Sequence, residues 1–156
     1  MTINIEYLSK ADGIYSDPLA FKARALEEIS RAKRYATFVS MVSVDLSHAD
    51  IQDEIENYSS YDDFMASLRK LVKASIRETD LVSDYDRHKI SILLLDTAKE
   101  GASSLADRLR KLIRYFMCSN IKSPINWRVP IKEYYFPDAG DDDLNIQSFL
   151  DKLGLI

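Results

Sequence analysis

The sequence predicts an α+β domain in which helices cover a central, mostly antiparallel sheet. Apolar residues recur at helical spacing in three long segments, and alternating, β-branched segments lie between them. Two of these strand segments are separated by only a few polar residues, which makes them a hairpin and therefore antiparallel. The length of 156 residues fits one domain with a single core. We assign residues 17–156 to this domain and residues 1–16 to a leader of uncertain structure.

The first helix is expected to begin at Asp17, because aspartate accepts hydrogen bonds from the first free N–H groups of a helix. Pro18 follows at the first turn, where its missing N–H costs nothing. Apolar residues then recur every three to four positions up to about Tyr35. The alternating segment 37–45 predicts a strand, and a polar, acidic connection over 47–60 follows it.

The rest of the chain continues the same alternation of elements. The expected elements are a helix over 61–76, strands over 81–85 and 89–95, a helix over 98–118, a strand over 125–136 and a helix over 141–154. The strand over 89–95 is apolar enough to be central in the sheet. Pro130 makes the strand over 125–136 irregular or an edge strand, and the acidic start of the last segment suits a helix N-terminus.

Composition excludes several broad classes of function. The net charge of −4 argues against a general nucleic-acid or membrane-surface binder. The single cysteine, Cys118, excludes a disulfide framework and a cysteine-based metal site. No apolar run approaches the ~20 residues that span a bilayer, and the start of the chain lacks the features of a signal peptide. We therefore expect a cytoplasmic protein that has no membrane segment.

The predicted hairpin carries a family resemblance. Its tip reads Asp86-Arg87-His88-Lys89-Ile90, although a tight turn usually favours glycine or asparagine. This stretch resembles the signature hairpin of GGDEF domains, the diguanylate cyclase family, which has Gly-Gly-Asp/Glu-Glu-Phe there. Further matches are the segments 28–35, 42–45 and 106–110. The likeness covers residues 17 to about 153 and implies a GGDEF, palm-like fold with the β-α-β-β-α-β plan of a ferredoxin-like core.

The resemblance implies that the catalytic half of the site is lost. The family joins two GTP molecules with two divalent metals, which need acidic oxygen ligands. Lys89 stands in place of an acidic metal ligand and would repel a dication. His88 replaces the acidic residue associated with catalysis. Asp86 and Arg87 replace the glycines that let the backbone approach GTP. We therefore predict no enzyme activity, no catalytic residue and no bound metal.

Two further residues match the family's active site without restoring it. Asp45 corresponds to the metal-binding aspartate at the end of the first strand, and Asp62 corresponds to an aspartate that contacts guanine. The family's guanine-contacting asparagine is replaced by Asp53. We interpret Asp45, Asp62 and the hairpin tip together as a vestigial active site.

A second motif of the family is intact. Its Arg-x-x-Asp, which binds guanine bases of cyclic di-GMP (c-di-GMP) as product, is present as Arg77 and Asp80. An arginine fork matches guanine O6 and N7, and a carboxylate can accept from guanine N1–H and N2–H. Arg108, or its neighbour Arg110, matches the family's secondary ligand contact. The alternative for Arg77 and Asp80 is purely structural, as a helix C-terminal cation and a turn residue.

These observations predict a catalytically inactive GGDEF-like signalling domain that binds c-di-GMP through Arg77, Asp80 and Arg108. It needs no cofactor, binds no nucleic acid and acts on a signalling protein partner, with homodimerisation left open. One alternative is a ligand-free interaction or scaffold module that uses the charged hairpin for partner choice. Another is a pseudoenzyme that binds GTP without turning it over.

Overall fold

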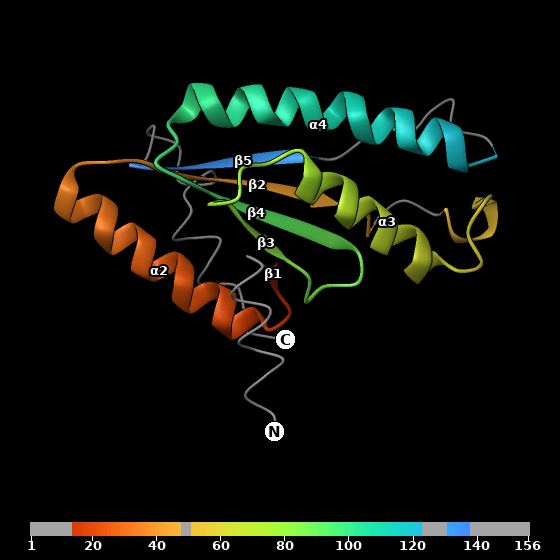
Figure 1. The fold of residues 1–156 in the computed structure, drawn as a ribbon, viewed down its shortest axis with the longest axis horizontal. Helices are drawn as coiled ribbons and strands as arrows, with labels where there is room; N and C mark the ends of the chain where they lie inside the picture. The colour runs from red at the N-terminus through yellow and green to blue at the C-terminus, as the bar shows by residue number, and fades with distance from the viewer. Residues whose placement is uncertain (1–13, 48–50, 123–130, 138–156) are drawn as a thin grey trace.

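The structure is a computed structural model that describes residues 14–47, 51–122 and 131–137 (Figure 1). The elements in chain order are β1 (Ile14–Tyr15), α2 (Pro18–Tyr35), β2 (Val39–Asp45), the 3-10 turn η1 (Gln52–Glu54), α3 (Tyr61–Ala74), β3 (Leu81–Ser83), β4 (Lys89–Leu95), α4 (Lys99–Asn120) and β5 (Ile131–Phe136). The strands form one sheet in the order β1-β3-β4-β2-β5. This confirms the predicted α+β class.

The sheet is antiparallel except at one edge. β2 pairs with β4 and β5, and β3 pairs with β4, all antiparallel, whereas β1 pairs with β3 in parallel. Helices α3 and α4 lie over one face of the sheet and α2 lies under the other (Figure 1). The arrangement places the β3–β4 loop beside the N-terminal end of α3, and the α3–β3 turn beside the start of α4.

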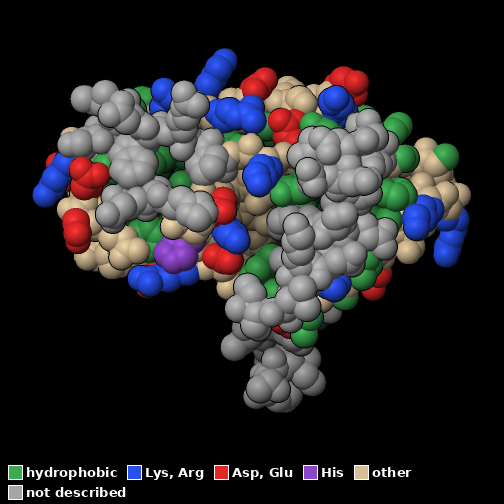
Figure 2. Space-filling view, turned by 180° about the vertical axis from the view of Figure 1, so that it is seen from behind, with side chains coloured by type: hydrophobic (Ala, Val, Ile, Leu, Met, Phe, Trp, Pro, Cys, Tyr) green, Lys and Arg blue, Asp and Glu red, His purple; other side chains and the backbone are tan. Residues whose placement is uncertain are grey.

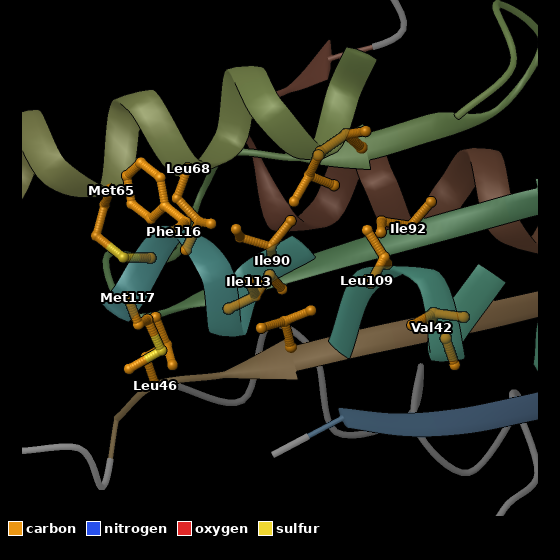
Figure 3. Packing of buried hydrophobic residues seen from close by; sticks show 14 of the residues in the cluster. Val42, Leu46, Met65, Leu68, Ile90, Ile92, Leu109, Ile113, Phe116 and Met117 are labelled. Atoms are coloured by element: carbon orange, nitrogen blue, oxygen red, sulfur yellow. The ribbon is translucent and has the colours of Figure 1, made fainter. Parts of the chain in front are cut away.

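Alternation along the strands divides the core into two layers. On the α3–α4 face, Val42, Ile90 and Ile92 pack against Leu109 and Ile113 (Figure 3). On the other face, a smaller cluster beneath α2 is formed by strand residues and by the buried side of that helix. Successive residues of a strand point to opposite faces, so β2 and β4 supply side chains to both clusters. This two-sided burial explains why both strands are nearly continuous in apolar residues.

Helix α2 has the predicted start and a tight end. The Asp17 side chain accepts a hydrogen bond from the backbone N–H of Leu19, and Pro18 occupies the first turn. At the C-terminus, Ala36 adopts a left-handed conformation with φ 54°, and Thr37 N donates to Ala32 O at 3.0 Å. Thr37 thus belongs to the helix cap, which is why β2 begins at Val39 and not at the expected residue 37.

The buried face of α2 contains one carboxylate. Glu28 is 4% exposed, and its Oε1 lies 3.4 Å from Arg24 Nε and 3.5 Å from Arg31 Nη1. A buried charge is tolerated when opposite charges surround it. Glu28 and Arg31 both belong to the segment 28–35 that resembles the family motif. In this structure the two residues form an ion pair that compensates a buried charge on the helix.

Strand β1 was not expected from the sequence. It lies inside the leader, yet it joins the sheet beside β3, with Ile14 opposite Val82 and Tyr15 opposite Ser83. Asp84 N also donates to Tyr15 O at 2.6 Å, which directs the backbone of Asp84 toward β1 and ends β3 before the expected residue 85. Predicted elements over 125–130 and 141–154 lie outside the described residues.

Candidate functional site

The β3–β4 loop, residues 84–88, is held by its own polar groups. The Asp86 side chain accepts from His88 N at 2.8 Å, which closes a small turn without glycine. Arg69 of α3 forms an ion pair with Asp84, at 3.0 Å between Nε and Oδ1, and donates to Asp86 O at 2.5 Å. The start of the loop is therefore anchored to α3, while the side chains of Arg87 and Lys89 remain exposed.

The same loop contacts the N-terminal end of α3. Arg87 Nε lies 2.9 Å from Asp62 Oδ1, and its guanidinium lies over the Tyr61 ring, 5.4 Å from the ring centroid. His88 Nδ1 is 2.9 Å from the Tyr61 hydroxyl. Burial raises the pKa of Tyr61, so this hydroxyl stays protonated and can donate to the imidazole. Figure 2 shows the histidine with basic and acidic side chains beside it.

The predicted vestigial residues therefore lie in one region, and several of them already have partners there. Asp62, the match to a guanine-contacting aspartate, is paired with Arg87. Asp45 ends β2 directly opposite Lys89 in the β2–β4 register, and its Oδ1 accepts from Ser47 N at 2.8 Å. A cation at the position of an acidic ligand repels a metal ion, so these residues do not fit the two-metal centre of the cyclase reaction. No cluster of three or more His, Cys, Asp or Glu side chains forms a metal site among the described residues.

Arg77 and Asp80 form a clamp at the α3–β3 turn. Asp80 is 2% exposed, and its carboxylate accepts from Arg77 Nε at 3.2 Å and Arg77 Nη2 at 3.0 Å. It also accepts from the backbone N–H groups of Arg77 at 3.1 Å and Leu95 at 3.4 Å. The hydrogen bond to Asp80 raises the pKa of Arg77. The structural alternative considered for this motif therefore exists in the molecule.

The Arg77 side chain also connects to the turn after β4. Its Nη2 lies 2.6 Å from Leu95 O and 2.6 Å from Thr97 Oγ1. The guanidinium thus ties the turn after α3 to the turn before α4. Even so, the Arg77 side chain is 56% exposed, and none of its hydrogen bonds to described residues uses Nη1. The clamp fixes the direction of the guanidinium and leaves one side of it available.

A pocket of about 360 Å³ opens beside the clamp. It lies between the C-terminal end of α3 and the first half of α4, and its lining includes Arg77, Asp80 and Arg108 together with Thr97 and Gly101. A Cβ at Gly101 would lie 2.8 Å from the Thr97 Cγ2 atom, so a larger residue there would displace Thr97. All three residues predicted to bind the ligand therefore border one pocket. Arg110 faces elsewhere, toward Asp107 at 2.8 Å and Glu133 at 3.6 Å.

Sequence reasoning missed three residues that organise these regions. Tyr61 marks only the start of the helix expected over 61–76, yet its hydroxyl lies 2.9 Å from His88 Nδ1. Arg69 anchors the hairpin, and Thr97 positions Arg77. The contacts of Arg69 and Tyr61 join residues 15 to 27 positions apart, and such pairs leave no periodic signal in a single sequence.

Solved structures of other proteins share the fold described above. No family model and no curated protein matches the chain, but solved structures do. A diguanylate cyclase from Thermotoga maritima matches 90% of this chain and 95% of its own, with 17% identity and a TM-score of 0.58. The diguanylate cyclase SiaD from Pseudomonas aeruginosa, solved with its activator SiaC, matches 98% of this chain and 64% of its own, with 13% identity and a TM-score of 0.60. The chain has the fold of GGDEF domains.

A third GGDEF-fold neighbour was solved with a ligand. The GGDEF domain of DgcB from Caulobacter crescentus, in complex with c-di-GMP, matches 78% of this chain and 71% of its own, with 11% identity and a TM-score of 0.55. These likenesses confirm the predicted GGDEF-like, α+β fold. Within the described residues, no helix of this GGDEF-like domain has the length and apolar content to cross a membrane.

Proposed function

We propose that this chain is a catalytically inactive GGDEF-like domain that binds c-di-GMP and acts in the cytoplasm as a regulator of a signalling partner. The observation that carries the proposal is the pocket bordered by Arg77, Asp80 and Arg108. Two arginines beside one cavity provide charge for a phosphate and donors for guanine O6 and N7. The c-di-GMP complex of a neighbour with the same fold supports the ligand class.

The proposal gives Arg77 and Asp80 different tasks. Because the Asp80 oxygens already accept several hydrogen bonds, Asp80 acts as a positioning residue that holds Arg77. Arg77 then meets the ligand through the side of its guanidinium that the clamp leaves available. Arg108, exposed on α4, adds the second cation. A fixed guanidinium loses little side-chain entropy on binding, which favours affinity.

Calorimetric titration with c-di-GMP tests the binding site. We expect the wild-type protein to bind, and Arg108→Ala to weaken the affinity by about tenfold or more, because one charge-assisted contact is lost. Arg108 is a better first variant than Arg77, since its removal leaves the clamp intact. Lys111→Ala, an exposed cation on the same helix but outside the pocket lining, should bind like wild type. No heat at high micromolar ligand would overturn the receptor proposal.

We also expect the protein to form no c-di-GMP from GTP and Mg²⁺. The reason is the charge distribution around the hairpin tip: Lys89 lies opposite Asp45 in the β2–β4 register, and Arg87 forms an ion pair with Asp62. Chromatographic analysis of the reaction products, with an active diguanylate cyclase as the positive control, provides the measurement. Product that depends on the purified wild-type protein would contradict the proposed inactivity. In the GTP-binding pseudoenzyme alternative, Asp62 would have to leave its exposed ion pair with Arg87 before it could accept from a guanine.

A ligand-free interaction module is the second candidate function. The observation in its favour is the clamp itself, which gives Arg77 and Asp80 a structural task without any ligand. In that case the exposed Arg87 and Lys89 at the hairpin tip would contact the partner. The titration separates the two candidates, because an interaction module has no reason to bind c-di-GMP at the arginine pocket.

A further inference from the structure

A groove runs along the outer side of α3, at the sheet edge formed by β1 and β3. Its volume is about 540 Å³, within the ~300–1,000 Å³ range of small-ligand sites. The apolar part of the lining comes from Ile14 and Val82 on the strands and from Ala66 and Ala74 on α3. The groove shares only Ala74 with the arginine pocket, which lies on the other side of the α3 C-terminal end. It is therefore a separate concavity.

The groove exists because β1 adds a strand that α3 does not cover. Helices α3 and α4 lie over the central strands, while β1 is at the edge of the sheet (Figure 1). Ile14 and Val82 are register partners, so their side chains point to the same face, toward α3. The helix presents two alanines there, and their short side chains leave space between the helix and the strands.

The polar part of the lining is mainly cationic. It consists of Arg69, Lys70 and Lys73, with Asp84 as its single acidic residue. Arg69 already pairs with Asp84 at 3.0 Å, so these two charges offset each other. Among the described residues, no ion-pair partner accompanies Lys70 or Lys73. Two uncompensated cations beside an apolar floor stand out in a protein with a net charge of −4.

We propose that this groove binds a small amphiphilic anion, an organic molecule with an apolar body and one carboxylate, sulfonate or phosphate group. The apolar body would lie on Ile14 and Val82, where its burial is favourable. The anionic group would lie between Lys70 and Lys73, which attract it by charge and donate hydrogen bonds. The site differs from the proposed c-di-GMP site in place and in ligand class, and the proposal does not rest on that function.

Fluorescence titration with 8-anilinonaphthalene-1-sulfonate, an apolar anion that brightens when buried, tests the proposal. The folded wild-type protein should give one saturable binding event. The double variant Lys70→Glu/Lys73→Glu should weaken it by about tenfold or more. The matched control Lys111→Glu/Arg114→Glu carries the same charge change on exposed positions of α4 and should leave the affinity unchanged. Circular dichroism confirms that all three proteins are folded.

Competition defines the ligand class. Decanoate should displace the dye, whereas the uncharged decanol should displace it at least about tenfold less effectively, because it lacks the group that the lysines recognise. Displacement by decanoate but not by inorganic phosphate shows that the apolar floor contributes. The proposal is overturned by absence of saturable binding, by equal loss in both double variants, or by equal displacement by decanoate and decanol.

Discussion

Replacing Phe64 by alanine is expected to lower the free energy of unfolding by about 3–5 kcal/mol, the range for a large aromatic side chain removed from a packed core. Phe64 is fully buried in the larger cluster. Its ring lies 5.0 Å from that of Phe116, 6.0 Å from that of Tyr58 in an edge-on arrangement, and 6.4 Å from that of Tyr61. The truncation removes apolar burial and these ring contacts together.

The effect should extend to the β3–β4 loop, because Phe64 packs against the tyrosine that contacts His88. Urea unfolding followed by circular dichroism gives the stability change. Tyr115→Ala is the matched control, since it truncates a helical aromatic residue that is 77% exposed. Its effect on the free energy of unfolding should stay within about 0.5 kcal/mol. If Phe64→Ala behaved like this control, the assignment of Phe64 to the core would be wrong.

The regular elements could be predicted because their signals are local. Periodic apolar residues located α2, α3 and α4 to within a few residues, and alternation located β2 and β4. β1 could not be predicted in this way, since a two-residue strand is too short to show a pattern. Its existence depends on β3, which lies far along the chain and pairs with it in parallel.

In the candidate sites, too, the residue types could be predicted from the sequence, whereas their contacts could not. The spacing of Arg77 and Asp80 is visible in the sequence, and so are the charged residues Asp86 and Arg87 at the hairpin tip. What the sequence could not show is that the carboxylates of Asp62 and Asp80 already have partners within the chain. Asp62 is bound by Arg87, and Asp80 is bound by Arg77. A motif specifies which groups are present, whereas the contacts decide which of them are available to a ligand.

Replacing Asp80 by alanine is expected to destabilise the protein by about 2–3 kcal/mol. The change removes the acceptor of two backbone N–H groups, those of Arg77 and Leu95, at a buried position where water cannot fully replace it. It also releases the Arg77 guanidinium. Because the Arg77 side chain is about half exposed, solvent screens that part of the loss, and the backbone groups account for much of the effect.

Comparison with three variants separates this role from ligand binding. Asp80→Asn keeps one carbonyl oxygen but turns an NH2 group toward two N–H donors, so it should also destabilise the protein, by about 1–3 kcal/mol. Asp107→Ala breaks an exposed ion pair with Arg110 and should cost less than about 0.5 kcal/mol. Arg77→Ala should cost less than Asp80→Ala, and a double-mutant cycle gives the coupling between the two residues. A stability of Asp80→Ala equal to wild type would mean that the carboxylate is free to serve a ligand alone. The expected loss instead means that Asp80 serves the fold first, and affects ligand binding only through the orientation of Arg77.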